Sequence, residues 1–211
     1  MQDIETETRR VLVEEGIAGC GQRLIAACSG GRDSICLLHV LKKLRQELRF
    51  ELCVVYVHHG LRPEADQEAT WLTELAEEWG ISCRIRHVNV LERVERTGES
   101  VEEAARNLRY AVLREEADGG YIVTAHHLED QAETVLLHLI RGCGLKGLGG
   151  MERRQNQILR PFLGISRERI DAYIQENQLK YMEDASNADD TYTRNWIRMR
   201  LLPMLREKNP S

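Results

Sequence analysis

Short apolar runs alternate with amphipathic segments along the first 140 residues of the chain. Four runs predict buried strands, at residues 23–28, 50–57, 81–90 and 121–124, because each is short and mostly apolar. Between and after them, apolar residues recur every three or four positions, which predicts helices around residues 37–48, 72–79, 101–108 and 128–139. Ser100 and Glu103 form the capping-box pattern at the start of the third helix.

Repeated strand–helix units of this length predict an α/β fold, a three-layer parallel sheet of about five strands with helices on both faces. The pattern changes after residue 150, where a short Ile158-Leu159 run is followed by helical stretches at 166–177 and 194–205. We therefore expect an α/β domain over residues 1–150. Residues 151–211 would complete it as a basic, mostly helical C-terminal part.

The charge is distributed unevenly along the chain. The 211 residues carry 42% hydrophobic and 30% charged positions, which is ordinary for a globular protein and argues against a disordered chain. The formal net charge of -5 divides into -9 over residues 1–140 and +4 over residues 141–211. A basic C-terminal third is compatible with a phosphate-bearing partner, although the excess is a weak signal by itself.

The chain shows no sign of a membrane or secretory destination. Its uncharged stretches are too short to cross a bilayer, and the first ten residues are acidic and polar, so we expect a cytoplasmic protein with reduced cysteines. The six cysteines include no CxxC pair, which argues against a zinc ribbon or a cysteine-held iron–sulfur cluster.

The strongest chemical motif follows the first predicted strand. Ser29, Gly30, Gly31, Arg32, Asp33 and Ser34 stand between this strand and the next helix, at the edge of the sheet where α/β folds bind ligands. Two glycines allow a close backbone approach to an anion, and the hydroxyls and the helix N-terminus complete a phosphate cradle. The segment lacks the Walker A spacing. The alternative is a tight turn with an ordinary helix cap.

Two charged pairs at helical spacing are further candidates. Arg106 and Arg109 share one helix face and could stabilise phosphate charge, or could pair locally with Glu102 and Glu103. Asp130 and Glu133 lie on the polar face of their helix. Two carboxylates there could hold a cationic substrate, and the alternative is a solvated helix face.

Three other features are ambiguous. The doubled histidines, His58-His59 and His126-His127, lack the spacing of a zinc site, so contacts with nucleotide, phosphate or backbone are favoured. Residues 142–147 match GxGxxG but follow a helix, so we interpret them as a mobile glycine-rich loop or a plain helix stop. Asn195 could present an amide to a substrate, beside a basic amphipathic helix.

The SGGxDS loop resembles the pyrophosphate-binding loop of the N-type ATP pyrophosphatases, whose fold is adenine nucleotide α-hydrolase-like. Other segments narrow the resemblance to the tRNA(Ile)-lysidine synthetase family over nearly the whole chain. They are 58–62 (HHGLR), 105–110 (ARNLRY), 124–134 (TAHHLEDQAET), 141–148 (RGCGLKGL), 160–161 (RP), 184–187 (DASN) and 194–195 (RN). The family's usual Asp-Asp pair is Glu129-Asp130 here.

This resemblance implies an enzyme that uses ATP and Mg²⁺ to join L-lysine to the wobble cytidine of isoleucine tRNA, at the anticodon loop. Ser29 to Ser34 would bind ATP, Asp33 would meet Mg²⁺, and Arg106 would stabilise phosphate charge. Asp130, Glu133 and Asn195 would hold lysine, with Glu129 less certain.

Two other functions remain open, a tRNA thiolation enzyme of the same superfamily and an adenine-nucleotide sensor without catalysis. Homodimerisation is also open. Because the resembling family commonly continues into C-terminal tRNA-gripping domains, the length of 211 residues suggests a catalytic core without them, either shortened or minimal.

Overall fold

The computed structural model describes residues 3–19, 21–182 and 193–209. Segment 184–187, part of the family resemblance, lies outside these ranges. The described chain forms an α/β fold around one six-stranded sheet in the order β3-β2-β1-β4-β6-β5. The strands are β1 (Arg23–Ala27), β2 (Glu51–His58), β3 (Ser82–His87), β4 (Tyr121–Val123), β5 (Arg154–Gln155) and β6 (Ile158–Leu159).

All neighbouring strands are parallel except the edge pair. β1 pairs with β2 and β4, β2 with β3, and β4 with β6, all in parallel register. β5 runs antiparallel to β6 and forms the outer edge. The predicted parallel α/β sheet is therefore confirmed. Strands β5 and β6, both beyond residue 150, extend this same sheet.

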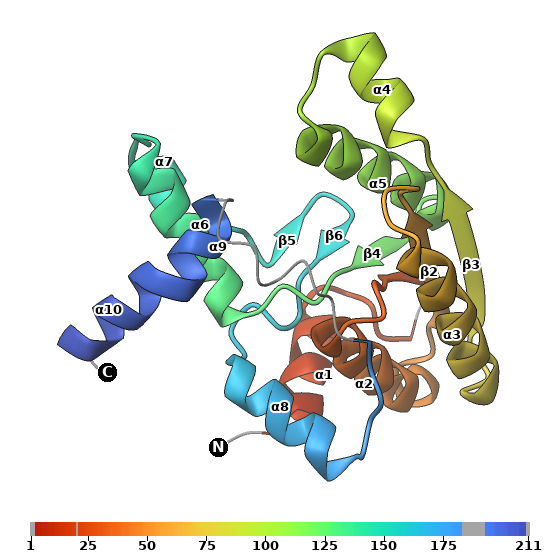
Figure 1. Ribbon diagram of the computed structural model, residues 1–211. Helices are drawn as coiled ribbons and strands as arrows, with labels where there is room; N and C mark the ends of the chain where they lie inside the picture. Colours follow the sequence, from red (N-terminus) through yellow and green to blue (C-terminus); the bar gives the residue numbers. More distant parts are fainter. Residues whose placement is uncertain (1–2, 20, 183–192, 210–211) are drawn as a thin grey trace.

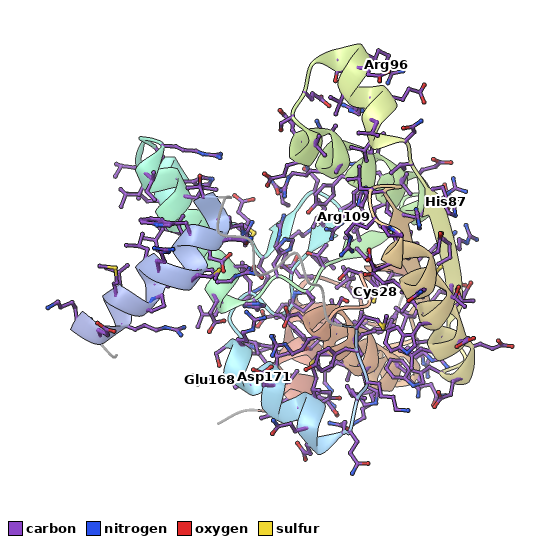
Figure 2. The ribbon with its side chains drawn as sticks, viewed as in Figure 1. Cys28, His87, Arg96, Arg109, Glu168 and Asp171 are labelled. Carbon is purple, nitrogen blue, oxygen red and sulfur yellow. The ribbon has the colours of Figure 1, made fainter. Side chains whose placement is uncertain are left out.

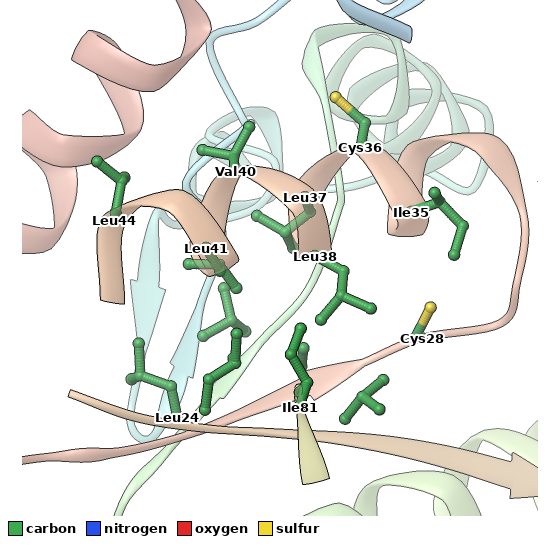
Figure 3. Close-up of a cluster of buried hydrophobic side chains, with 14 of the residues drawn as sticks. Leu24, Cys28, Ile35, Cys36, Leu37, Leu38, Val40, Leu41, Leu44 and Ile81 are labelled. Atoms are coloured by element: carbon green, nitrogen blue, oxygen red, sulfur yellow. The ribbon is translucent and has the colours of Figure 1, made fainter. Parts of the chain in front are cut away.

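One face of the sheet is covered by α1 (Ile4–Glu14), α2 (Arg32–Leu48), α3 (Glu64–Glu78) and α8 (Arg167–Glu176) (Figure 1). Side chains of β1 point alternately to the two faces of the sheet, and Leu24 and Ala26 belong to the core on this face. Figure 3 shows Leu24 of β1 below the apolar stripe of α2, which includes Leu37, Leu38 and Leu41. These side chains are buried, and α2 is thereby fixed over the end of β1.

The opposite face is covered by α5 (Val101–Ala117), with α4 (Val90–Thr97) packed beyond it. Ile25 and Ala27, which alternate with the residues facing α2, join a second core with Tyr110 and Leu113 of α5. Ser100 caps α5 by accepting a hydrogen bond from the N–H of Glu103 at 3.2 Å. The start of this helix was predicted from those two residues.

Helix α4 begins where the third strand was predicted to continue. The prediction extended that strand to residue 90, but β3 ends at His87 and α4 starts at Val90. The side chain of Asn89 accepts a hydrogen bond from the N–H of Glu92 at 3.1 Å, so it acts as an N-cap. A helix cap therefore ends the extended segment before the apolar run is complete. The prediction was wrong for the last three residues.

The remaining helices lie together beside the sheet. They are α6 (Leu128–Ile140), α7 (Leu145–Leu148), α9 (Thr193–Trp196), the π-helical segment η2 (Ile197–Leu201) and α10 (Leu202–Lys208). Figure 1 shows α7 and α10 projecting away from the sheet. No helix in the described ranges has the length and apolar content needed to cross a bilayer.

Candidate active site

The loop between β1 and α2 is held by its own serines. The Ser34 hydroxyl donates to the carbonyl of Gly31 at 2.8 Å and accepts from the N–H of Ser29 at 3.3 Å. The N–H of Gly31 donates to the Ser29 hydroxyl at 3.4 Å. Because Gly31 is the N-cap of α2, the cap residue has no side chain to occupy the first-turn N–H groups. The loop therefore has the form of an anion cradle at a helix N-terminus.

Later parts of the chain fasten this loop. Gly30 has a φ of +80°, a left-handed conformation that favours glycine, and its carbonyl accepts a hydrogen bond from the N–H of Met182 at 2.9 Å. Arg32 pairs with Asp171 of α8, with 2.8 Å between Nη1 and Oδ1. Residues after position 150 thus fix the conformation of a loop at position 30.

The loop opens into a cavity of about 710 Å³ at the carboxyl ends of β1 and β4. Four arginines line it, together with two carboxylates and one histidine. These are Arg32, Arg109, Arg167, Arg198, Asp33, Asp130 and His126. The excess of fixed cations over carboxylates in one cavity suits a polyanionic ligand.

Asp33 combines burial with an unsatisfied oxygen. Its Oδ2 lies 3.6 Å from Nε2 of His127, while its Oδ1 is buried and finds no hydrogen-bond donor among the described residues. Burial alone would raise the pKa of Asp33, but the hydrogen bond and charge of His127, aided by Arg167, hold it below its usual value. Asp33 is therefore ionised near neutral pH, with one oxygen available to a ligand.

The structure tests whether this carboxylate fits Mg²⁺. Asp33 lines the cavity, and its buried Oδ1, which finds no donor among the described residues, is the kind of oxygen that a hard cation prefers. Magnesium commonly binds one or two carboxylates and takes its other ligands from water and substrate phosphates. Asp33 fits such a site. Within the described ranges, no group of three or more His, Cys, Asp or Glu side chains is arranged to hold a metal alone.

The adjacent histidines His126 and His127 have opposite protonation. Burial lowers the pKa of His126 to about 4, and its Nδ1 lies 2.8 Å from the hydroxyl of Thr124. Burial would also lower the pKa of His127, but hydrogen bonds with Asp33 and Glu129 raise it to about 9. His126 is thus a neutral side chain that lines the cavity. His127 is a buried cation that organises the carboxylates around it.

Glu129 belongs to this same network. Burial would raise the pKa of Glu129, but its hydrogen bonds with His127 and with the N–H of Arg167 lower it to about 2. Its Oε1 lies 3.4 Å from Nη2 of Arg206. Glu129 therefore joins α6 to α8 and α10, and it is not among the cavity-lining residues.

Asp130 and Glu133 differ sharply in their surroundings. Asp130 lines the cavity, and its Oδ1 lies 3.2 Å from Nη2 of Arg194. Glu133 is 0% exposed and pairs with Nε of Arg194 at 2.8 Å and Nε of Arg198 at 2.5 Å. The polar face of α6 is thus covered by the C-terminal helices. Asp130 alone of the pair borders the open space.

The two candidate arginines of α5 also differ. Arg109 lines the cavity and is half-buried, and Figure 2 shows it between α5 and the central strands. No ion pair of Arg109 with a described carboxylate is present, and its guanidinium carbon lies 5.9 Å from the centre of the Tyr110 ring. Burial lowers its pKa. Arg106 is exposed, lies 5.2 Å from the same ring centre, and is outside the cavity lining.

A smaller cavity of about 170 Å³ adjoins the first, and Arg109 borders both. Val55 and Val57 of β2 line it, with His59. Burial lowers the pKa of His59 to about 4, and its Nδ1 is buried with no hydrogen-bond partner in the part of the chain described. Arg62 and Glu68 also line it, and the apolar side chains near the carboxyl end of β2, beside a neutral imidazole, suit a flat, uncharged group such as a nucleobase.

The glycine-rich segment after α6 is fastened to that helix. The side chain of Gln131 donates to the carbonyls of Gly149 and Met151 at 3.1 and 3.0 Å, and accepts from the N–H of Met151 at 2.7 Å. Gly150 has a φ of +65°, a left-handed conformation that favours glycine, and a Cβ there would also lie 2.7 Å from Oε1 of Gln131. The segment contains the short helix α7 and is more than a helix stop.

The structure brings together Ser29, Gly31, Arg32, Asp33, Ser34 and Asp130 of the predicted site residues. Asn195 lies on α9 and is not among the cavity-lining residues. Arg167 and Tyr181 were not predicted for the site. Arg198 belongs to the predicted basic amphipathic helix and was not predicted for the site, although its spacing of four from Arg194 on a helix puts both on one face. The roles assigned to these residues stay predictions.

The sequence of the chain is similar to that of known proteins over most of its length. The profile of the PP-loop domain family matches residues 2–205. Curated relatives named tRNA(Ile)-lysidine synthase are 39% identical over 192 residues in Clostridioides difficile, 41% over 199 in Alkalilimnicola ehrlichii and 43% over 196 in Edwardsiella ictaluri. These alignments cover 89 to 92% of this chain but 42 to 44% of the relatives. The chain therefore spans less than half their length.

Solved structures share the fold at low sequence identity. A U34-tRNA thiolase from Methanococcus maripaludis, solved with a 4Fe-4S cluster, superposes with a TM-score of 0.81 at 16% identity and covers 98% of this chain and 73% of that one. An NH3-dependent NAD synthetase from Campylobacter jejuni gives a TM-score of 0.59 at 14% identity, covering 99% and 86%. At these identities the likeness concerns the fold.

Proposed function

The chain belongs to the PP-loop domain family, and from this premise we propose that it catalyses the ATP-dependent ligation of lysine to C2 of the wobble cytidine of isoleucine tRNA. One observation carries the proposal. The loop between β1 and α2 and the side chain of Asp130 line the same cavity, so an activated phosphate and an amine substrate could meet in it. The names of the curated relatives point to the same reaction.

The first step would activate the base. The C2 carbonyl oxygen of cytidine attacks the α-phosphorus of ATP, a new phosphorus–oxygen bond forms, and the bond to pyrophosphate breaks. Ser29, Ser34 and the first-turn N–H groups of α2 would cradle the phosphates. The smaller cavity would take the adenine. Arg109 borders both cavities and would lie between adenine and phosphates.

Charge that develops on the phosphates needs fixed cations. Arg32, Arg109 and Arg198 line the cavity and are suited to this role. Arg106 would add its charge from an exposed position on the same helix once the RNA is bound. Asp33 would hold Mg²⁺ through its buried Oδ1, and the ion would neutralise phosphate charge.

The second step would form the lysidine bond. The ε-amine of lysine attacks C2, the carbon–oxygen bond to AMP breaks, and the amine gives up a proton. Asp130 is the carboxylate positioned to hold a cationic group of lysine at the cavity wall. Asn195, on α9 beside Arg194, would add an amide contact. Glu133 would contribute through the arginines it holds.

The reaction can be tested directly by incubating the protein with ATP, labelled lysine and an isoleucine tRNA transcript. We expect the label to enter the RNA with release of AMP and pyrophosphate. Incorporation of sulfur without lysine would identify a thiolation enzyme. Binding of ATP with neither reaction would identify a nucleotide-binding protein.

A further inference from the structure

The outer part of the helices beside the sheet, here called the arm, combines exposed apolar side chains with basic ones. We define it as residues 139–148, from the end of α6 through α7, and residues 193–208, which form α9, η2 and α10. Eight of its large apolar side chains are exposed. They are Leu139, Ile140, Leu145, Leu148, Trp196, Met199, Met204 and Leu205. Leu145 is 89% exposed, so this surface is not a partly covered core.

The same residues are strongly basic. The two stretches hold seven lysines and arginines and one acidic residue, Glu207, in a chain whose net charge is -5. Arg141, Arg200, Arg206 and Lys208 are exposed. Exposed apolar and cationic side chains therefore occur together along these helices, whereas the rest of the chain is acidic.

The arm is joined to the candidate active site by ion pairs. Arg206 of α10 lies 3.4 Å from Glu129, and Arg194 of α9 lies 3.2 Å from Asp130. Arg198 of η2 lines the cavity itself. A ligand lying along the arm would thus reach the mouth of the cavity.

From these observations we propose that the arm binds unpaired RNA nucleotides that flank the reacting base. This inference rests on the proposed function and deepens it by naming the surface. Phosphates match the excess of cations, and splayed bases match exposed Trp196 and the aliphatic side chains around it, because single-stranded RNA is bound by stacking as well as by charge. Neither the excess of cations nor the exposed apolar side chains would by itself favour RNA over other ligands.

The charge argues against a second copy of the chain as the occupant. A two-fold interface places the same patch against itself, so a symmetric contact through the arm would bring two strongly basic surfaces together. Interface cores between proteins are depleted in charged residues. RNA has the opposite charge and avoids this repulsion.

Direct RNA binding tests the proposal. The double variant Arg200→Gln/Lys208→Gln should lower affinity for an isoleucine tRNA transcript and reduce the slope of log affinity against log salt by about 1.4. The matched control, Arg10→Gln/Arg96→Gln, removes two exposed charges from α1 and α4 and should leave both quantities unchanged. Figure 2 shows Arg96 on α4, far from the arm.

Stacking is tested separately. Trp196→Ala should lower RNA affinity about tenfold with the salt slope unchanged. Leu91→Ala, at a 56% exposed position on α4, is the apolar control. Circular dichroism and thermal melting check that each variant is folded, and ATP binding without RNA should stay at the wild-type level.

The outcomes separate the two proposals. If wild-type protein modifies the transcript but the arm variants bind it like their controls, the arm is not the RNA surface and the proposed function stands. If the arm variants change the oligomeric state in size-exclusion chromatography and leave RNA binding unchanged, the arm is a protein interface. If wild-type protein binds no RNA, both proposals fail.

Discussion

The buried carboxylate of Glu133 and the guanidinium of Arg198 form an ion pair between α6 and the C-terminal helices, with 2.5 Å between Oε1 and Nε. Arg194 occupies the other oxygen at 2.8 Å. Burial alone would lower the pKa of Arg198, but the hydrogen bond to Glu133 raises it above its usual value. Glu133 therefore fixes a cation that lines the cavity, from a position that solvent does not reach.

Replacing Glu133 should cost stability. Glu133→Gln keeps the shape of the side chain but removes the charge that both arginines need, so we expect a loss of about 2 to 3 kcal/mol in the free energy of unfolding. Urea unfolding followed by circular dichroism measures it. Glu115→Gln, at an exposed pair with Arg86, should cost about 0.5 kcal/mol or less. Equal losses in the two variants would contradict the structural role of Glu133.

Asp130 should govern the lysine requirement. Asp130→Asn removes the carboxylate charge that borders the cavity, so the KM for lysine should rise about tenfold or more, with a smaller change in the KM for ATP. Steady-state kinetics with each substrate varied in turn measures the two constants. A larger effect on ATP would assign Asp130 to the nucleotide or its metal.

Asp33 should be needed for cleavage of ATP. Asp33→Asn keeps the size of the side chain but removes its charge and should lower pyrophosphate release about 100-fold or more. Asp66→Asn, at a side chain 80% exposed on α3, is the control for loss of one carboxylate. Circular dichroism checks the fold, because Asp33 contacts His127. Unchanged turnover would remove Asp33 from the site.

Substitutions of the two arginines of α5 should affect different kinetic constants. Arg109→Ala removes a cation from the cavity wall, and the KM for ATP should rise about tenfold or more. Arg106 is exposed and outside the lining, so Arg106→Ala should leave ATP binding unchanged and lower turnover with tRNA. ATP binding by calorimetry and turnover with RNA measure these effects. The reverse pattern would exchange the two roles.

His127 should make stability depend on alkaline pH. Its pKa is about 9 in the folded protein, against 6.5 for an ordinary exposed histidine. Its contribution to stability is therefore complete below about pH 6.5 and is lost as the pH rises through 9. His127→Asn should flatten the fall in unfolding free energy between these values, measured by urea unfolding at a series of pH values. The exposed His87→Asn is the control, and it should keep the wild-type slope.

Local patterns predicted the sheet and the loop well. β1, β2 and β4 agree with the predicted runs within one residue at each end, because strands buried on both faces are continuous apolar runs. The anion loop was predicted since its glycines and serines stand between a strand and a helix. Helix α1 was not predicted, because its few apolar residues are separated by charged and polar ones. Its apolar spacing, at Ile4, Val11 and Leu12, is helical.

Contacts between residues far apart in the sequence could not be predicted, and these contacts decide which candidate residues reach the cavity. The polar face of α6 gave no sign that Glu133 is buried, since the residues that cover it are 61 and 65 positions later in the chain. The same limit applies to Arg109 and Arg106. Both lie on one helix face, and only packing against β1 and β2 decides which of them lines the cavity.

The loop between β1 and α2 is held by residues that are translated much later, and this order matters during synthesis on the ribosome. The hydroxyl of Tyr173 donates to Glu5, and Arg169 donates to Glu7, across separations of 168 and 162 residues. At about 5–20 residues per second, roughly ten seconds or more pass before the partners of α1 emerge. During that interval α1 lacks these contacts, and the carbonyl of Gly30 lacks its hydrogen bond from the N–H of Met182. The loop between β1 and α2 is therefore translated early, yet it reaches its final form only when Met182 has left the exit tunnel.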